Sequence, residues 1–232
     1  TFATRDLCNI MLRDSAKIQE QDIEYLNKKR VRANQPLLQP IYTMADAAQA
    51  MKQFLGIGYE RPYQVIPGIT VTFYDAGHVL GSAIVVLDVA GQEGQPPARI
   101  VFSGDLGRAH RPILNDPVYI ESADILLLES TYGNREHPQD QDTDHLLEDV
   151  IRDTVKKGGK VIVPAFAIGR TQELVFRLNN LVENGDLPPN LQVFVDSPLA
   201  IDATAVFRAH PEAYDEETAE VMMTDPDHNP FG

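Results

Sequence analysis

The chain has 232 residues, of which 43% are hydrophobic and 23% charged, an ordinary balance for a globular protein. Its net charge of −14 argues against a nucleic-acid partner, because phosphate binding is driven largely by Lys and Arg. The single cysteine, Cys8, excludes an internal disulfide and fits a reducing compartment. No apolar run approaches the roughly 18 residues that a membrane span needs. The composition therefore predicts a cytoplasmic globular protein with no membrane segment.

The N-terminal part predicts two helices followed by several strands. Apolar residues recur at helical spacing between residues 4 and 29, with Thr4 placed to cap the start. A connector broken by two prolines then leads to Thr43-Met-Ala-Asp46, which is typical of a capping box and predicts a second helix up to about residue 54. Strands are predicted at residues 69–75, 82–90, 99–103 and 124–128, because these runs are apolar or alternate apolar and polar residues.

From residue 143 the pattern changes to alternating helix and strand. The expected elements are a helix that stops at Gly158-Gly159, a strand at 160–164, a helix at 171–183, a strand at 192–195 and a helix at 200–210. Strand and helix in close succession predict a parallel sheet. We therefore expect an α/β protein with a domain boundary near residue 140, giving domains 1–140 and 141–232.

Two strand ends carry side chains that bind metals. His78 follows the strand at 69–75 in Gly-His-Val-Leu-Gly-Ser, and Asp105 follows the strand at 99–103 in Ser-Gly-Asp-Leu-Gly. A rigid strand followed by glycine is a good mount for a ligand, and zinc prefers imidazole and carboxylate donors. Taken alone, however, such a histidine is more often structural, and an aspartate beside glycine more often caps a turn.

Three further positions are candidates for catalysis or substrate binding. Glu129 ends an apolar strand, where a carboxylate is either catalytic or a cap for the next turn. Arg170 opens a helix directly after a strand, in Gly-Arg-Thr, which is either an anion site or an ordinary turn. Ser197 lies in Asp-Ser-Pro-Leu at the end of the next predicted strand. Acidic residues cluster at 136–153 and 202–227, as is usual for solvated helix faces. These clusters do not exclude a local basic path beside them.

Together these motifs resemble the β-CASP branch of the metallo-β-lactamase superfamily, from Thr1 to about Tyr214. The resemblance implies part of the metallo-β-lactamase αββα sandwich followed by part of a Rossmann-like β-CASP domain. It implies that His78 binds one of two zinc ions, that Asp105 bridges both, and that Glu129 orients a histidine that protonates the leaving group. Arg170 and Ser197 would face the substrate. The implied activity is that of an RNA-processing nuclease, similar to the RNA 3′-end processing exonucleases. The implied substrate is single-stranded RNA. The sequence does not decide whether the protein forms a homodimer.

The family's His-x-His-x-Asp-His loop is absent from the sequence, and we expect it to precede residue 1, with the second half of the β-CASP domain after residue 232. The chain would then be an internal fragment that binds little zinc by itself. A catalytically silent scaffold is the alternative, whereas the strand–helix pattern after residue 140 argues against a small-molecule ester or thioester hydrolase. The other histidines are expected to be surface or packing residues without a metal role: His110, His137, His145, His210 and His228.

Overall fold

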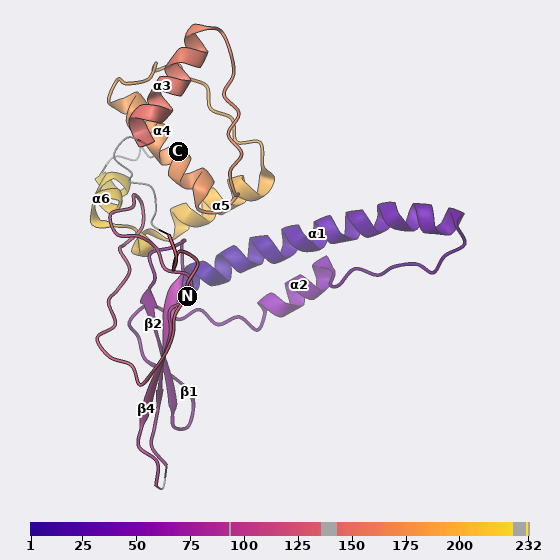
Figure 1. Ribbon diagram of the computed structural model, residues 1–232. Helices are drawn as coiled ribbons and strands as arrows, with labels where there is room; N and C mark the ends of the chain where they lie inside the picture. The colour runs from indigo at the N-terminus through magenta and orange to yellow at the C-terminus, as the bar shows by residue number, and fades with distance from the viewer. Residues whose placement is uncertain (93, 136–142, 225–230, 232) are drawn as a thin grey trace.

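The computed structural model describes residues 1–92, 94–135, 143–224 and 231. It combines a twisted sheet with two helices that extend to one side and a group of helices at one end of the sheet (Figure 1). The mixed α/β class predicted from the sequence is confirmed.

The sheet is a meander that ends in a parallel pair. Its strands, in spatial as well as sequence order, are β1 (Tyr63–Ile66), β2 (Ile69–Asp75), β3 (Ala83–Val89), β4 (Ala98–Phe102) and β5 (Ile125–Leu127). Neighbours are antiparallel except β4 and β5, which are parallel, with Phe102 opposite Leu127. Because β2, β4 and β5 therefore run in the same direction, their carboxyl ends meet at one edge. The last four strands were predicted, whereas β1 was missed.

The two N-terminal helices extend away from the sheet (Figure 1). In α1 (Phe2–Arg32), Thr1 rather than the predicted Thr4 is the N-cap, since its hydroxyl accepts a hydrogen bond from the Thr4 amide. Thr4 instead donates its hydroxyl to the Gly81 carbonyl at 2.6 Å. In α2 (Met44–Met51) the predicted capping box is confirmed, because Thr43 and Asp46 each accept a hydrogen bond from the other's backbone amide. Among the described helices, none combines the length and the apolar character needed to cross a lipid bilayer.

The C-terminal elements are helical. They are α3 (Thr143–Lys156), α4 (Arg170–Glu183), α5 (Pro198–Ala209), the short 3-10 helix η1 (Pro211–Ala213) and α6 (Glu216–Thr224). The helices predicted at 171–183 and 200–210 are confirmed within two residues at each end, and the stripe before Gly158 forms α3. The helix α6 was not predicted.

The strands predicted at 160–164 and 192–195 do not form within the described part of the chain. Both segments are irregular, and their apolar side chains are exposed: Ile162 is 89% and Phe194 82% accessible. An apolar, β-branched run becomes a strand only when a neighbouring strand satisfies its backbone groups. Neither segment pairs with a strand of the sheet, so the prediction of a parallel sheet here is wrong for the chain as described.

A mixed hydrophobic core joins the two ends of the chain. It brings Leu7 of α1 and Leu80 of the loop after β2 together with Phe176 of α4 and Phe207 of α5. Smaller cores lie against the sheet, around Val86, and between α3 and α4. The domain boundary expected near residue 140 falls in residues 136–142, outside the described residues, and remains a prediction.

Two glycines bring the loops after β2 and β4 into backbone contact. Gly107 donates its amide to the Ala76 carbonyl at 2.7 Å. A Cβ atom on Gly107 would overlap the Gly77 carbonyl group, so only glycine allows this approach. On its other side Gly77 lies against Asn115 and Pro117. The loop that carries His78 is thus fixed to the loop that carries Asp105.

We predict that Gly107→Ala destabilises the chain by about 1–3 kcal/mol or more, because the loops must separate to admit the methyl group. The measurement is thermal unfolding followed by circular dichroism. Gly58→Ala is the matched control, since its added Cβ would make ordinary van der Waals contacts with the side chains of Arg61 at 3.5 Å and Phe2 at 3.8 Å. Equal melting temperatures for the two variants would show that the two loops are not in contact.

Candidate functional site at the carboxyl edge of the sheet

The loop after β2 is held by side chains that hydrogen-bond its backbone. Asp75 is buried and accepts a hydrogen bond from the Gly77 amide at 2.8 Å. Burial raises the pKa of Asp75, and hydrogen bonds from Gly77 and Asn115 offset part of that rise. Ser82 accepts hydrogen bonds from the amides of His78 and Val79 at 3.1 and 3.2 Å. These contacts leave the His78 backbone fixed and its side chain 44% exposed.

The loops after β4 and β5 are tied together by Ser103 and Glu129. The buried Ser103 hydroxyl accepts a hydrogen bond from the Glu129 amide at 3.0 Å, and the Ser103 amide donates to the Leu127 carbonyl. The Glu129 carboxylate in turn accepts a hydrogen bond from the Leu106 amide at 2.6 Å. Because Leu106 follows Asp105 directly, Glu129 positions the backbone that carries Asp105.

Three of the predicted site residues therefore lie together. His78 Nε2 is 4.0 Å from Asp105 Oδ2, and the Asp105 side chain is 76% exposed. A hydrogen bond from the Thr131 side chain, another from the Leu106 amide and the nearby His78 hold the pKa of Glu129 below its usual value. Glu129 is thus a carboxylate at neutral pH, suited to orient a neighbouring group rather than to donate a proton.

His78 and Asp105 fit part of a zinc site. The 4.0 Å between the two donor atoms is shorter than the sum of one Zn–N and one Zn–O bond, about 4.2 Å, so one ion can reach both. A catalytic zinc normally has three protein ligands. The described residues contain no group of three or more His, Cys, Asp or Glu arranged to hold a metal. The pair therefore supplies two of the required donors.

The turn that precedes α4 lies against the His78 loop. A Cβ atom on Gly169 would lie 3.4 Å from Val79 Cγ1, which places Arg170 beside the residue that follows His78. The Arg170 guanidinium is 62% exposed and pairs with Glu173 at 2.9 Å. The first amides of this helix are already occupied, since Arg170 and Thr171 donate to Ile168 and Phe166. An anion would therefore meet the Arg170 side chain rather than the helix terminus itself.

Ser197 acts as the N-cap of α5, where its hydroxyl accepts a hydrogen bond from the Ala200 amide at 3.2 Å. The helix that it caps is joined to the turn before α4 by Gln172, which is completely buried. The Gln172 amide group donates to the Ala167 and Ala200 carbonyls and to the Thr204 hydroxyl, and its oxygen accepts from the Gly169 amide. Gln172 thus joins the turn before α4 to the first turn of α5.

The sequence reasoning missed Asp75, Ser82, Ser103 and Gln172. Local signals existed for two of them. An aspartate two residues before a glycine, as in Asp75-Ala-Gly77, is typical of a side chain that hydrogen-bonds its own turn. A Gln three residues after the N-cap of a helix, as Gln172 is after Gly169, is typical of a capping box. Of the other histidines, His137 and His228 lie outside the described residues, and His210 is buried.

Comparison with known proteins shows what the chain is similar to. The model of the Beta-Casp domain matches residues 171–231. An RNase J-like protein of Methanocaldococcus jannaschii is 35% identical over 172 residues, which cover 73% of this chain and 39% of the relative. The transcription termination factor FttA of Methanosarcina mazei is 31% identical, over 82% of this chain and 29% of the relative. Endoribonuclease YSH1 of Kluyveromyces lactis is 31% identical, over 82% and 24%.

The matched domain and the named relatives agree on one class. The chain belongs to the β-CASP family of the metallo-β-lactamase superfamily. It spans well under half the length of each of these relatives.

The lowered pKa of Glu129 gives a prediction about pH. The usual pKa of a glutamate is roughly 4.3, and that of Glu129 is lower. As the pH falls, the Glu129 carboxylate and its hydrogen bond from the Leu106 amide therefore persist past the usual pKa and are lost only when the pH falls through the lowered one. An NMR titration of the Leu106 amide would report this. Glu129→Gln is the control and should remove the transition. A transition at or above the usual value, or one that survives in the control, would contradict the prediction.

Proposed function

We propose that this chain carries part of the active site of a zinc-dependent RNA phosphodiesterase of the cytoplasm. The observation that carries the proposal is the position of His78, Asp105 and Glu129 at one edge of the sheet, with Arg170 in the turn beside them. The named relatives include a ribonuclease-like protein and an endoribonuclease, which supports RNA as the substrate class. The unpaired Cys8 fits a reducing compartment.

In this proposal His78 and Asp105 would hold the metal, and Asp105 would be the carboxylate shared between two ions. Zinc, when bound, supplies Lewis-acid activation of water and of the phosphate. Glu129 keeps the Asp105 loop in place through the Leu106 amide and, as an ionised carboxylate, accepts a hydrogen bond from a histidine that acts on the leaving oxygen. The completing ligands and that histidine would come from residues other than those that the structure describes.

The substrate side of the proposal rests on Arg170. Its exposed guanidinium can bind a phosphate in a bidentate way, and Glu173, Gln172 and Val79 fix the turn that carries it. Ser197, as the cap of α5, shapes the neighbouring loop. A positive side chain beside the metal ligands would attract RNA locally, although the chain as a whole carries a net charge of −14.

The first prediction is that Asp105→Asn weakens zinc binding at least about tenfold in the protein at its full natural length, because a neutral amide is a poor ligand for cations. RNA cleavage should fall with it. Isothermal titration with zinc and a cleavage assay on single-stranded RNA measure the two effects. The exposed Asp149 of α3 gives the control variant, Asp149→Asn, which should match the unmodified protein.

Two outcomes would contradict this first prediction. Full zinc affinity in Asp105→Asn would remove Asp105 from the metal site. If the unmodified protein, loaded with zinc, binds RNA without cutting it, the scaffold hypothesis is favoured over the nuclease hypothesis.

The second prediction is that Arg170→Ala weakens RNA binding and lowers the salt dependence by about 0.7 in the slope of log K against log salt, the value of one phosphate contact on a single strand. Zinc affinity should not change. Lys28→Ala is the control, because Lys28 carries the same charge near the C-terminal end of α1. Figure 1 shows this helix extending away from the sheet. Equal affinity and equal slope in both variants would show that Arg170 is only part of the turn.

A further inference from the structure

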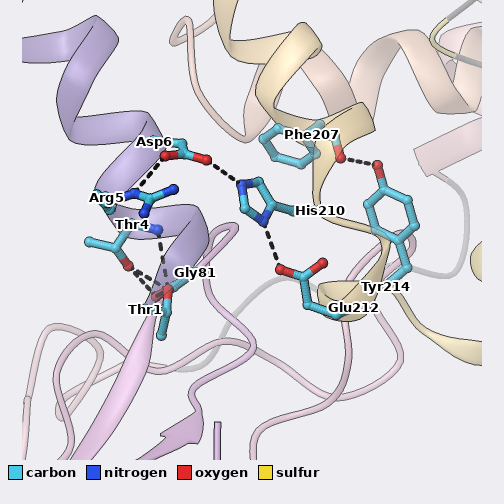
Figure 2. Close-up of polar contacts among 9 residues, drawn as sticks. All are labelled: Thr1, Thr4, Arg5, Asp6, Gly81, Phe207, His210, Glu212 and Tyr214. Carbon is cyan, nitrogen blue, oxygen red and sulfur yellow. Dashed lines mark hydrogen bonds and ion pairs between the residues drawn. The ribbon is translucent and has the colours of Figure 1, made fainter. Parts of the chain in front are cut away.

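His210 lies at a junction between distant parts of the chain. It is the C-cap of α5 and the residue before η1, and its side chain is 8% exposed. Figure 2 shows its ring between two carboxylates, Asp6 of α1 on one side and Glu212 of η1 on the other. Nε2 is 3.0 Å from Asp6 Oδ2, and Nδ1 is 2.7 Å from Glu212 Oε1.

This geometry determines how many nitrogens of the His210 ring carry a hydrogen. A carboxylate can only accept hydrogen bonds, so each contact requires a hydrogen on the ring nitrogen that it meets. A neutral imidazole has one such hydrogen, whereas the imidazolium has two. The C-terminal end of α5 also favours a positive charge, because the last carbonyl groups of a helix point there.

The same junction reaches the loop that carries His78. Thr1 and Thr4, in the first turn of α1, donate their hydroxyls to the Gly81 carbonyl at 3.0 and 2.6 Å (Figure 2). A side chain on Gly81 would collide with the Thr4 amide, so the loop and the helix are in direct contact. Asp6 lies two residues after Thr4. Whatever holds Asp6 therefore also holds the end of the His78 loop.

We propose that His210, with a hydrogen on both ring nitrogens, is a positioning residue that latches α5 and η1 to α1 and thereby keeps the His78 loop in place. The latch is defined by Asp6, His210 and Glu212. Its consequence for metal binding rests on the proposed function, whereas the latch itself does not. Since the closed latch holds a ring hydrogen that an open, neutral ring lacks, raising the pH favours opening.

The ring is surrounded by other titratable and charged groups. Burial lowers the pKa of the Thr1 amino group in the 232-residue chain, so this group also loses a proton as the pH rises. Because Thr1 is the same in every variant, a difference in pH dependence between variants reports on the ring. From α1, Arg5 hydrogen-bonds Asp6; burial would raise the pKa of Asp6, but the hydrogen bonds from Arg5 and His210 outweigh it and hold the pKa below the usual value. Burial raises the pKa of Tyr59 and of Tyr214, so both phenols stay neutral. Arg208 of α5, which lies near Tyr214, stays positive, and Glu212 is the ring's second carboxylate partner.

Two variants separate the latch from simple packing. In His210→Gln the single amide cannot bridge both carboxylates, so the latch opens. In Glu212→Gln the amide can donate to a neutral ring nitrogen, so the bridge persists without a second ring hydrogen. His145→Gln is the control, because His145 is 78% exposed and contacts only Glu148 of its own helix among the ion pairs of the described residues.

The experiment is NMR of the 232-residue chain between roughly pH 5 and 9, a range that covers imidazole titration. We expect two ring hydrogens on His210 in the closed state. Amide exchange at Val79 and Ser82 should be several-fold faster in His210→Gln than in the unmodified chain at the low end of the range, a difference that shrinks as the pH rises. Glu212→Gln should exchange slowly with a weaker pH dependence than the unmodified chain, and His145→Gln should match the unmodified chain.

A His210 ring with one hydrogen in a closed structure would overturn the proposal, as would unchanged loop exchange in His210→Gln. Unaltered pH dependence in Glu212→Gln would also overturn it, since packing alone would then explain the contacts. None of these readouts requires zinc or RNA, so their failure is distinct from a failure of the proposed nuclease.

Discussion

The hydrogen bond from the Gly107 amide to the Ala76 carbonyl holds together the two loops on which the candidate site depends. It forms because β2 and β4 run in the same direction and end at the same edge, and because two glycines let the backbones touch. His78 and Asp105 then lie 4.0 Å apart, and both side chains remain exposed.

A second set of contacts joins this edge to the C-terminal helices. Gln172 is buried and connects the turn of Arg170 to α5, and the latch connects the other end of α5 to α1. The shared core around Leu80 and Phe207 lies between these two connections. The residues proposed to bind substrate are therefore placed by polar contacts at both ends of one helix, and the position of that helix is sensitive to a single buried ring.

The sequence predicted the parts of the site that local patterns determine. A strand, a glycine turn and a polar residue occur together at His78 and at Asp105, so both positions could be found and their proximity expected. The strands at 160–164 and 192–195 were predicted wrongly, because a strand depends on a neighbour that no local pattern reveals. His210 was expected to be a surface or packing residue, and its partner Asp6 lies 204 positions away, beyond the reach of any spacing rule.

The most direct test of the central claim is a crystal of the protein at its full natural length grown with zinc, with diffraction collected at the zinc absorption edge. The account predicts an anomalous peak within bonding distance of both His78 Nε2 and Asp105 Oδ2, and Asp105 in contact with a second peak. Zinc bound elsewhere, or no peak at this edge of the sheet in a saturated crystal, would contradict it.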